Sequence, residues 1–176
     1  MTSPRTILAI DLGKKGAIIA ERGNVRRVWQ AQLKASTWQP GPNTEPDPHK
    51  FLQQWGVIVG WLEGDPGLVV VEGASWHAPK GRKMNPGTAG RLGMEHMAWR
   101  MLLAALRVPF IIAPAKKWQK AIGVPQRRGL DVKAEVQRIV AARLPDVDLY
   151  PGTNRKNAHD GIADAAGMLL YARTLS

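Results

Sequence analysis

The chain has 176 residues, which is enough for one domain with a substantial buried core. It carries 25 Lys and Arg against 14 Asp and Glu, and this net charge of +11 favours a polyanionic partner, nucleic acid before a membrane surface. The absence of cysteine excludes a disulfide scaffold and a thiolate metal site.

Apolar segments in the chain are short. The N-terminal apolar run over residues 7–10 ends at Asp11 and is too short for a signal peptide. The longest apolar stretch, residues 101–113, is broken by Arg107 and Pro109 and falls short of the ~20 residues that cross a bilayer. We therefore expect a soluble protein of the cytoplasm, or of the host cytoplasm if a virus encodes it, with no membrane partner.

Three strands are predicted at the start of the chain. TILAIDLG has the pattern of a buried strand, and AIIAERG and NVRRVWQAQL predict a hairpin about a Gly-Asn turn. A proline-rich loop over residues 35–48 leads to a helix that begins near His49 and ends at Gly64, where apolar residues recur at helical spacing. GLVVVEGASW, which contains Glu72, predicts a strand buried on both faces.

The second half of the chain is predicted to be mostly helical. Residues 77–90 are basic and rich in Gly and Pro, which is typical of a substrate-facing loop. Next come a long helix over 91–107, an edge strand in PFIIAP, a short helix in KKWQKAI, a basic loop in VPQRRGL and a helix over 131–144 capped by Asp131. The closing helix HDGIADAAGMLLYA completes a single α/β domain over residues 1–176 with a mixed sheet.

Four carboxylates fall on elements that should be buried. Asp11 ends the first strand and Glu72 ends the VVVE strand, so neighbouring strands would bring them together. Asp160 and Asp164 lie one turn apart on one face of the closing helix. Each alone also fits a solvated strand end or a polar helix face. Together they favour a hard divalent cation, because a buried carboxylate is costly without a compensating cation or donors.

The quoted segments together are similar to a known family. ILAIDLGKKG, VVVEGASW, RLGMEHMA, VPFIIAPAKKWQKAIG, VKAEVQRIV and HDGIADAAGMLLYA follow the order and spacing of the RuvC-like Holliday junction resolvases of the RNase H superfamily. This resemblance implies an RNase H-like mixed five-stranded sheet, three antiparallel strands and then two parallel ones, flanked by helices. It also implies a homodimeric endonuclease that uses Mg²⁺ or Mn²⁺ and resolves four-way DNA junctions by paired symmetric nicks.

The resemblance also implies ligands for the metal. Three acidic positions of the family are matched by Asp11, Glu72 and Asp164. The fourth position falls on Gly161, so Asp160 is assigned to it, with His159 as the alternative. Two ions roughly 4 Å apart would activate a water and stabilise the leaving oxygen. Asp11 would bridge both ions, Glu72 would hold one, and Asp160 and Asp164 would hold the other.

Basic and aromatic residues are expected to contact the DNA. Lys133 matches a lysine that the family keeps near the scissile phosphate, although it also fits an exposed helix face. Trp76, one place later than the family's aromatic residue, would stack on bases or pack in the core. One basic residue of KKWQK is expected at the DNA, among Lys116, Lys117 and Lys120. Phosphate contacts are expected from Lys80, Arg82, Lys83, Arg127 and Arg128.

The helix from Arg91 to Leu106 is the expected dimer contact. Its apolar side offers Leu92, Met97, Met101 and Leu102. The resemblance assigns this side to a second copy, with residues near Met97 against their own counterparts, and the alternative is that it packs on the chain's own sheet.

Three other functions are compatible with parts of the pattern. IDLGKKG is similar to the first phosphate motif of actin-like sugar kinases, but the second phosphate loop and the adenosine site are missing, so no nucleotide cofactor is expected. A different RNase H-like nuclease, acting on other branched DNA or on ribosomal RNA, would carry similar carboxylates. A non-catalytic DNA-binding module would have lost an acidic position, and none is lost here.

Overall fold

The computed structural model describes residues 6–12, 16–30, 48–73, 86–151 and 158–175. Within them, one sheet has the order β3-β2-β1-β4-β5. Its strands are β1 (Thr6–Asp11), β2 (Ala17–Arg22), β3 (Val25–Gln30), β4 (Leu68–Gly73) and β5 (Phe110–Pro114). The first three are antiparallel, β4 joins β1 in parallel and β5 joins β4 in parallel. The predicted mixed sheet is therefore confirmed.

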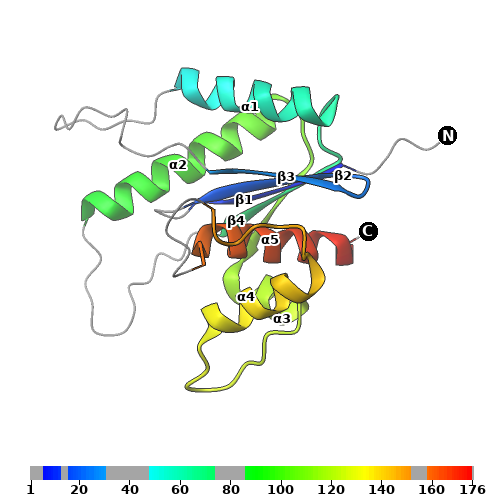
Figure 1. Cartoon of the computed structure of the whole chain (residues 1–176). Helices are drawn as coiled ribbons and strands as arrows, with labels where there is room; N and C mark the ends of the chain where they lie inside the picture. Colours follow the sequence, from blue (N-terminus) through cyan, green and yellow to red (C-terminus); the bar gives the residue numbers. More distant parts are fainter. Residues whose placement is uncertain (1–5, 13–15, 31–47, 74–85, 152–157, 176) are drawn as a thin grey trace.

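Helices cover both faces of the sheet (Figure 1). One face carries α1 (Pro48–Leu62) and α2 (Pro86–Ala105). The other carries α3 (Ala115–Ala121), α4 (Val132–Arg143) and α5 (Asp160–Ala172), and a short 3-10 turn, Arg173–Leu175, follows α5. None of the helices in the described part of the chain has the length and hydropathy needed to cross a bilayer.

Alternation along the strands sends two of the predicted ligands to the same face. Ile7 and Ala9 of β1 and Val70 of β4 belong to the core formed with α3, α4 and α5. Their neighbours in the two strands belong to the core formed with α1 and α2. Because side chains two residues apart in a strand share a face, Asp11 and Glu72 point to the α5 side.

Helix α5 is the buried centre of its layer. Every residue of α5 except Asp160 and Asp164 is buried, and the helix packs against β1, β2 and β4 on one side and against α3 and α4 on the other. Its contact with α3 is unusually close, since a Cβ added to Gly167 would lie 2.7 Å from Cζ3 of Trp118. The two aspartates are thus the exceptions in an otherwise apolar helix.

The start of α4 agrees with the sequence prediction, and the start of α2 does not. Asp131 caps α4 as predicted, and its carboxylate accepts a hydrogen bond from the main-chain N–H of Ala134 at 3.1 Å. Helix α2 begins at Pro86, so residues 86–90 belong to the helix and not to the predicted loop. Proline is favoured at the first position of a helix, where its missing N–H is not needed, and the sequence prediction counted it as part of a Gly- and Pro-rich loop.

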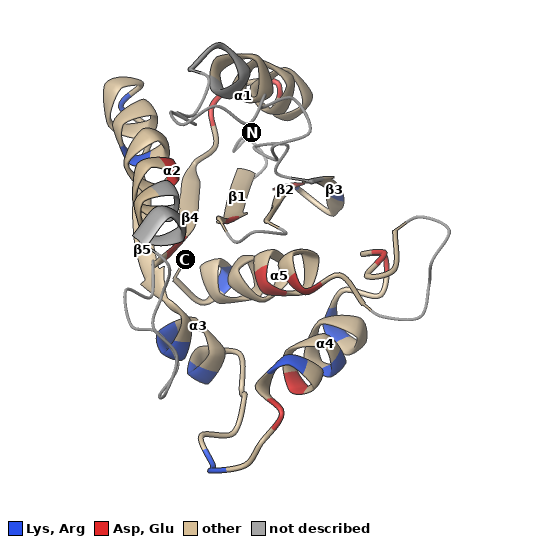
Figure 2. Cartoon of the chain, turned by 90° about the vertical axis from the view of Figure 1, so that its left-hand side faces the viewer, with Lys and Arg blue, Asp and Glu red and all other residues tan. Residues whose placement is uncertain are grey.

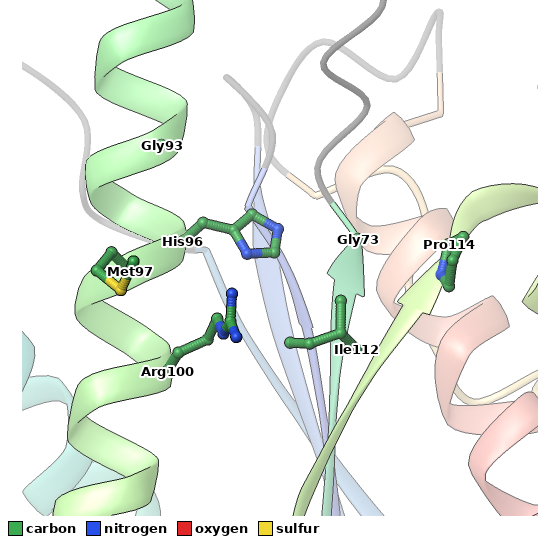
Figure 3. Close-up of a pocket in the computed structure, with 7 residues that line it drawn as sticks. All are labelled: Gly73, Gly93, His96, Met97, Arg100, Ile112 and Pro114. Carbon is green, nitrogen blue, oxygen red and sulfur yellow. The ribbon is translucent and has the colours of Figure 1, made fainter.

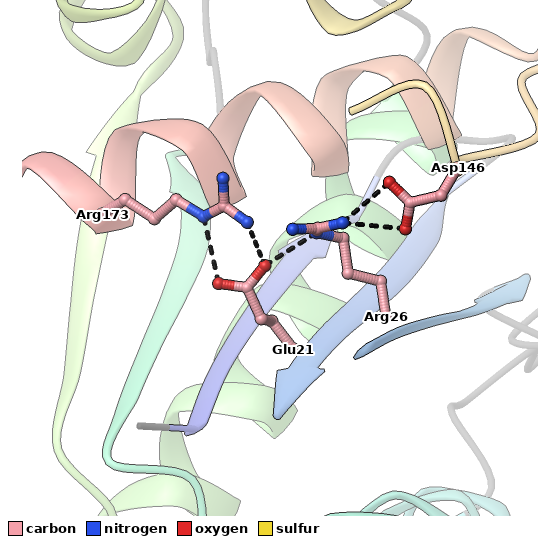
Figure 4. Close-up of polar contacts among 4 residues, drawn as sticks. All are labelled: Glu21, Arg26, Asp146 and Arg173. Carbon is pink, nitrogen blue, oxygen red and sulfur yellow. Dashed lines mark hydrogen bonds and ion pairs between the residues drawn. The ribbon is translucent and has the colours of Figure 1, made fainter. Parts of the chain in front are cut away.

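A network of four charged side chains ties the antiparallel strands to the C-terminal turn (Figure 4). Glu21 of β2 is only 6% exposed and accepts hydrogen bonds from Nε of Arg26 at 2.7 Å and from Nε of Arg173 at 3.0 Å. A second bond joins Arg173 to the same carboxylate. Nη1 of Arg26 also donates to both oxygens of Asp146, at 2.7 and 2.8 Å. The buried carboxylate is therefore fully served by guanidinium donors.

Candidate active site

Three of the predicted ligands lie at one end of the sheet. Asp11 ends β1 and is 4% exposed, and Glu72 is the next-to-last residue of β4. The parallel pairing of Ile10 with Val71 places these two residues side by side. Asp164 lies on α5, which packs over both strands. Sheet register and helix packing together bring three distant parts of the sequence to one place.

The pKa values show that these carboxyl groups repel one another. Burial above all, and then the charge of Asp11, a hydrogen bond to that side chain and the charge of Asp164, together raise the pKa of Glu72 to about 9. Burial raises the pKa of Asp164 to about 7, with added repulsion from Asp11 and Asp160 and an opposing effect of Lys133. The site therefore holds more negative charge than its own surroundings neutralise.

The indole of Trp118 adjoins Glu72 from α3. It opposes the rise in the pKa of Glu72, as an N–H group directed at a carboxylate does. Its Nε1 is buried with no full hydrogen bond to any described residue, so the indole acts as a nearby dipole. The sequence prediction selected the lysines around Trp118 and missed the indole; its place at the centre of KKWQK was the available signal.

Asp160 begins α5 and is held by two side chains of α4. Nζ of Lys133 donates to Oδ2 of Asp160 at 2.6 Å, and Nε2 of Gln137 donates to Oδ1 at 3.3 Å. The hydrogen bond to Asp160 raises the pKa of Lys133. Asp160 is thus near enough to Asp164 to affect its pKa while both of its oxygens contact α4. Gln137 was missed in the sequence, although its position one turn after Lys133 put it on the same helix face.

His159, the alternative to Asp160, is the N-cap of α5. Its Nδ1 accepts a hydrogen bond from the main-chain N–H of Ile162 at 3.2 Å. Each of the two alternatives for the fourth ligand therefore has a structural part at the start of α5, His159 as its cap and Asp160 as its link to α4.

The donor set fits a hard divalent cation in its chemistry. Carboxylate oxygens are the preferred ligands of Mg²⁺ and Mn²⁺, and a bound cation removes the repulsion that raises the pKa values of Glu72 and Asp164. Among the described residues, no three acidic or histidine side chains already form a compact metal-binding cluster.

Many Lys and Arg residues lie on the helices that pack beneath α5. Figure 2 shows Lys and Arg on α3, on α4 and on the loop between them, below α5 in that view. The described residues include five exposed candidates for DNA contact: Lys116, Lys117, Lys120, Arg127 and Arg128. The other predicted contacts, Trp76, Lys80, Arg82 and Lys83, lie outside the described residues.

The sheet order, the helices on its two faces and the carboxyl groups at the ends of β1 and β4 define an RNase H-like fold. Comparison with known proteins agrees with this class. No family model matches the sequence, and no curated protein matches it. The similarity is found among solved structures.

Those structures are of Holliday junction resolvases. RuvC of Thermus thermophilus has a TM-score of 0.57 at 16% identity, with 96% of each chain covered. T. thermophilus RuvC in complex with Holliday junction substrate has a TM-score of 0.55 at 15% identity, covering 97% of this chain and 96% of that one. The yeast mitochondrial Holliday junction resolvase Ydc2 has a TM-score of 0.60 at 15% identity, covering 99% of this chain and 82% of that one. At these identities the comparison establishes a RuvC-like fold.

Proposed function

We propose that this chain is a metal-dependent endonuclease that resolves four-way DNA junctions by paired symmetric nicks. The observation that carries the proposal is the convergence of Asp11, Glu72 and Asp164 at one end of a RuvC-like sheet, where each side chain faces the others. The substrate is inferred from the solved resolvases of the same fold, one of which is described in complex with a Holliday junction. The net charge of +11 supports a DNA partner.

In this proposal the carboxyl groups hold the pair of Mg²⁺ or Mn²⁺ ions that the resemblance implies, and the other side chains of the site contact the DNA. Asp11, Glu72 and Asp164 are the ligands, with Asp160 as the fourth. The bound ions would activate a water and stabilise the leaving 3′ oxygen. Lys133, positioned by its ion pair with Asp160, presents an ammonium group to the oxygens of the scissile phosphate.

The proposal is tested with three substrates and the purified protein. A synthetic four-way junction, a linear duplex of the same sequence and an RNA–DNA hybrid are incubated with Mg²⁺, with Mn²⁺ and with EDTA. We expect paired nicks in the junction only, and only with a divalent ion. Preferred cutting of the hybrid would point instead to another RNase H-like nuclease, and binding of the junction with no cleavage in either metal would point to a non-catalytic module.

Binding should depend on the exposed basic loop between α3 and α4. Each phosphate contact contributes roughly one unit to the slope of log affinity against log salt. Replacing Arg127 and Arg128 by alanine should therefore lower the slope by about two. Arg107→Ala, at an exposed arginine between α2 and β5, is the control and should leave the slope unchanged. Equal slopes for all the variants would remove this loop from the DNA contact.

A stripe of exposed methionines on α2 supports a homodimer. Met94 and Met101 lie seven residues apart on one side of α2 and are 40% and 65% exposed, while Met97, 53% exposed, lines a pocket beside Gly73. Leu102, which the sequence prediction placed on the same side, instead packs against the chain's own core, and the side chain of Leu92 lies outside the described part. The apolar side of α2 is thus divided between the sheet and a surface that a second copy could cover.

The dimer is tested by placing a charge on this stripe. In a two-fold interface, Met101→Glu faces its own copy or an apolar neighbour, so we expect a folded monomer that nicks without paired resolution. Leu52→Glu, at a comparably exposed position of α1, should leave the oligomeric state unchanged. A wild-type protein that sediments as a monomer at micromolar concentration, alone and on DNA, would contradict the dimer.

A further inference from the structure

The face of the sheet opposite α5 holds a pocket at the same end as the carboxyl groups. It has a volume of about 300 Å³, and its lining includes Gly73 of β4, Ile112 and Pro114 of β5, and His96, Met97 and Arg100 of α2 (Figure 3). Gly73 directly follows Glu72 in β4, so alternation directs the two residues to opposite faces. The pocket and the carboxyl groups are therefore separated by one residue of one strand.

His96 is the buried polar group of this pocket. The side chain is 8% exposed, and Figure 3 shows the imidazole projecting from α2 toward Gly73. One ring nitrogen hydrogen-bonds the main chain of Glu72, while Nε2 is buried with no partner among the described residues. In the tautomer that carries its proton on Nδ1 and donates it to the Glu72 main chain, the buried Nε2 is an acceptor that needs an N–H or O–H group.

Arg100 supplies a cation at the same pocket. It lies one turn after His96 on α2, it is exposed, and it makes no ion pair with any described residue. Opposite these polar groups, Met97, Ile112 and Pro114 form an apolar wall. The pocket therefore combines a site for an anion, an acceptor for a donor group and a surface for a flat apolar group.

We propose that this pocket seats one unpaired nucleotide of the DNA. Its phosphate would lie at Arg100, its base would pack on the apolar wall, and an N–H on the edge of the base would be donated to Nε2 of His96. A free phosphate would contact only Arg100, and an apolar ligand would contact only the apolar wall. A nucleotide is the ligand of a DNA-binding protein that uses all three.

The position of the pocket gives this nucleotide a place in the substrate, and here the inference rests on the proposed function. A strand whose phosphate lies at the carboxyl groups has only to pass round the end of β4 to reach Gly73. The seated nucleotide would then be close in sequence to the cut and would help to hold the scissile phosphate in place. Such a seat exists only where bases are unpaired, which is the condition at a branch point and not in linear duplex.

The pocket is tested by methyl NMR, which does not depend on cleavage. The methionines are labelled with ¹³C in their methyl groups, and the protein is titrated with the thymidine dinucleotide pTpT in EDTA. A base on the apolar wall should move the Met97 methyl signal upfield by its ring current, while Met168, which is fully buried under the other face, stays unchanged. Inorganic phosphate and abasic deoxyribose phosphate should not produce this shift.

Two variants assign the polar contacts. Arg100→Ala should lower the affinity for the dinucleotide at least fivefold. Arg143→Ala, which replaces an exposed arginine on α4, should leave that affinity unchanged. His96→Phe keeps a ring of similar size but has no acceptor, and should also weaken binding; circular dichroism of each variant establishes that it folds. An unchanged Met97 signal with pTpT, or an equal response to inorganic phosphate, would overturn the proposal.

The same titration separates this inference from the proposed function. A response at Met97 with no cleavage of any junction would support the nucleotide pocket and reject the nuclease. Metal-dependent junction cleavage that is unaltered in Arg100→Ala and His96→Phe, together with no response at Met97, would leave the nuclease standing and reject the pocket.

Discussion

Two buried carboxylates on neighbouring strands have opposite surroundings. Glu21 of β2 and Asp11 of β1 are 6% and 4% exposed and lie toward opposite ends of the sheet, on its α5 side. Glu21 is surrounded by arginines, in the network with Arg26 and Arg173. Asp11 lies beside further carboxyl groups, and burial together with the charge of Asp11 raises the pKa values of Glu72 and Asp164.

The difference shows what each end of the sheet contributes. Around Glu21, opposite charges and directional hydrogen bonds fix the β2–β3 hairpin to the C-terminal turn (Figure 4). Around Asp11, like charges are kept together at a cost to the folded chain, which is typical of a site that binds a cation. One end of α5 therefore carries opposite charges that stabilise the fold, and the other end carries like charges that the proposed function assigns to a cation.

The largest expected effect is on cleavage. Asp11→Asn, Glu72→Gln and Asp164→Asn should each lower junction cleavage by about 10³-fold or more, because each removes a ligand charge that supports several kcal/mol of transition-state stabilisation. Junction binding should be unchanged or tighter, since less negative charge then faces the phosphates. Single-turnover nicking and gel-shift binding measure the two quantities.

Asp160 and Glu21 are the comparison positions for that series. Asp160→Asn should be weaker than or equal to the other ligand variants, and a larger loss in His159→Ala would move the fourth ligand to His159. Glu21→Gln should leave the rate per folded molecule unchanged. If Asp11→Asn cuts at the wild-type rate in Mg²⁺, the assignment of the site is wrong.

The next effect is on stability at the other end of the sheet. Arg26→Met keeps the apolar part of the side chain but removes the guanidinium that donates to both Glu21 and Asp146. The free energy of unfolding should fall by about 3 kcal/mol. At about 2–4 °C per kcal/mol for a chain of this size, the melting temperature should fall by roughly 6–12 °C. Arg138→Met breaks the exposed pair with Glu135 and should cost less than about 0.5 kcal/mol.

A smaller effect is the pH dependence of stability. The carboxyl groups of Glu72 and Asp164 should make the free energy of unfolding decrease as the pH rises. The pKa values of Glu72 and Asp164 in the folded chain, about 9 and about 7, are higher than their ordinary values of 4.5 and 3.8. The folded state therefore holds more protons than the unfolded state, and stability present below about pH 4 is lost as pH rises through 7 to 9. Thermal melting in EDTA should show a steady decrease over this range.

Two changes should flatten that profile. Glu72→Gln removes a titrating group, and because one pKa unit corresponds to about 1.4 kcal/mol it should raise the melting temperature at pH 8 by about 3 °C or more. Mg²⁺ should also flatten the profile for the wild-type chain, because it favours the charged carboxylates. A melting temperature in EDTA that rises between pH 6 and pH 9 would contradict the electrostatic description of the site.

The smallest expected effect on stability is at Lys133. Its ion pair with Asp160 is exposed, with 68% and 36% of the two side chains accessible, so Lys133→Ala should change the free energy of unfolding by less than about 1 kcal/mol. Cleavage should fall much more, by about 10²-fold, if the ammonium group serves the transition state. If the cleavage rate fell only as far as the loss of folded protein explains, Lys133 would have a structural role and no role in catalysis.

Local patterns were enough to predict the sheet and the meeting of the carboxyl groups. The apolar run that ends at Asp11 and the VVVE run that ends at Glu72 specify strands, and parallel pairing follows from the helix between them. The i, i+4 spacing of Asp160 and Asp164 specifies one helix face. These features depend on short segments and on general rules of chain topology.

Contacts between distant segments could not be predicted in the same way. The pairing of Glu21 with Arg173, and the meeting of His96 with the main chain of Glu72, depend on how α5 and α2 lie on the sheet. A single sequence gives no register for helix packing. In the sequence, His96 has no feature that separates it from the other polar residues of its helix. Only the fold places it on the face of the sheet opposite the carboxyl groups.

The close contact between Gly167 and Trp118 sets the distance between α5 and α3. Because the indole rests on a helix backbone with no side chain, the thickness of one aromatic ring sets the height of α3 above the sheet, and with it the height of Lys117 and Lys120. A single methyl group at Gly167 would collide with this indole, so the indole, which also adjoins Glu72, or one of the two helices would have to move. In the proposed nuclease such a shift would change the position of the α3 lysines relative to the carboxyl groups, although Gly167 itself carries no side chain that could bind DNA or metal.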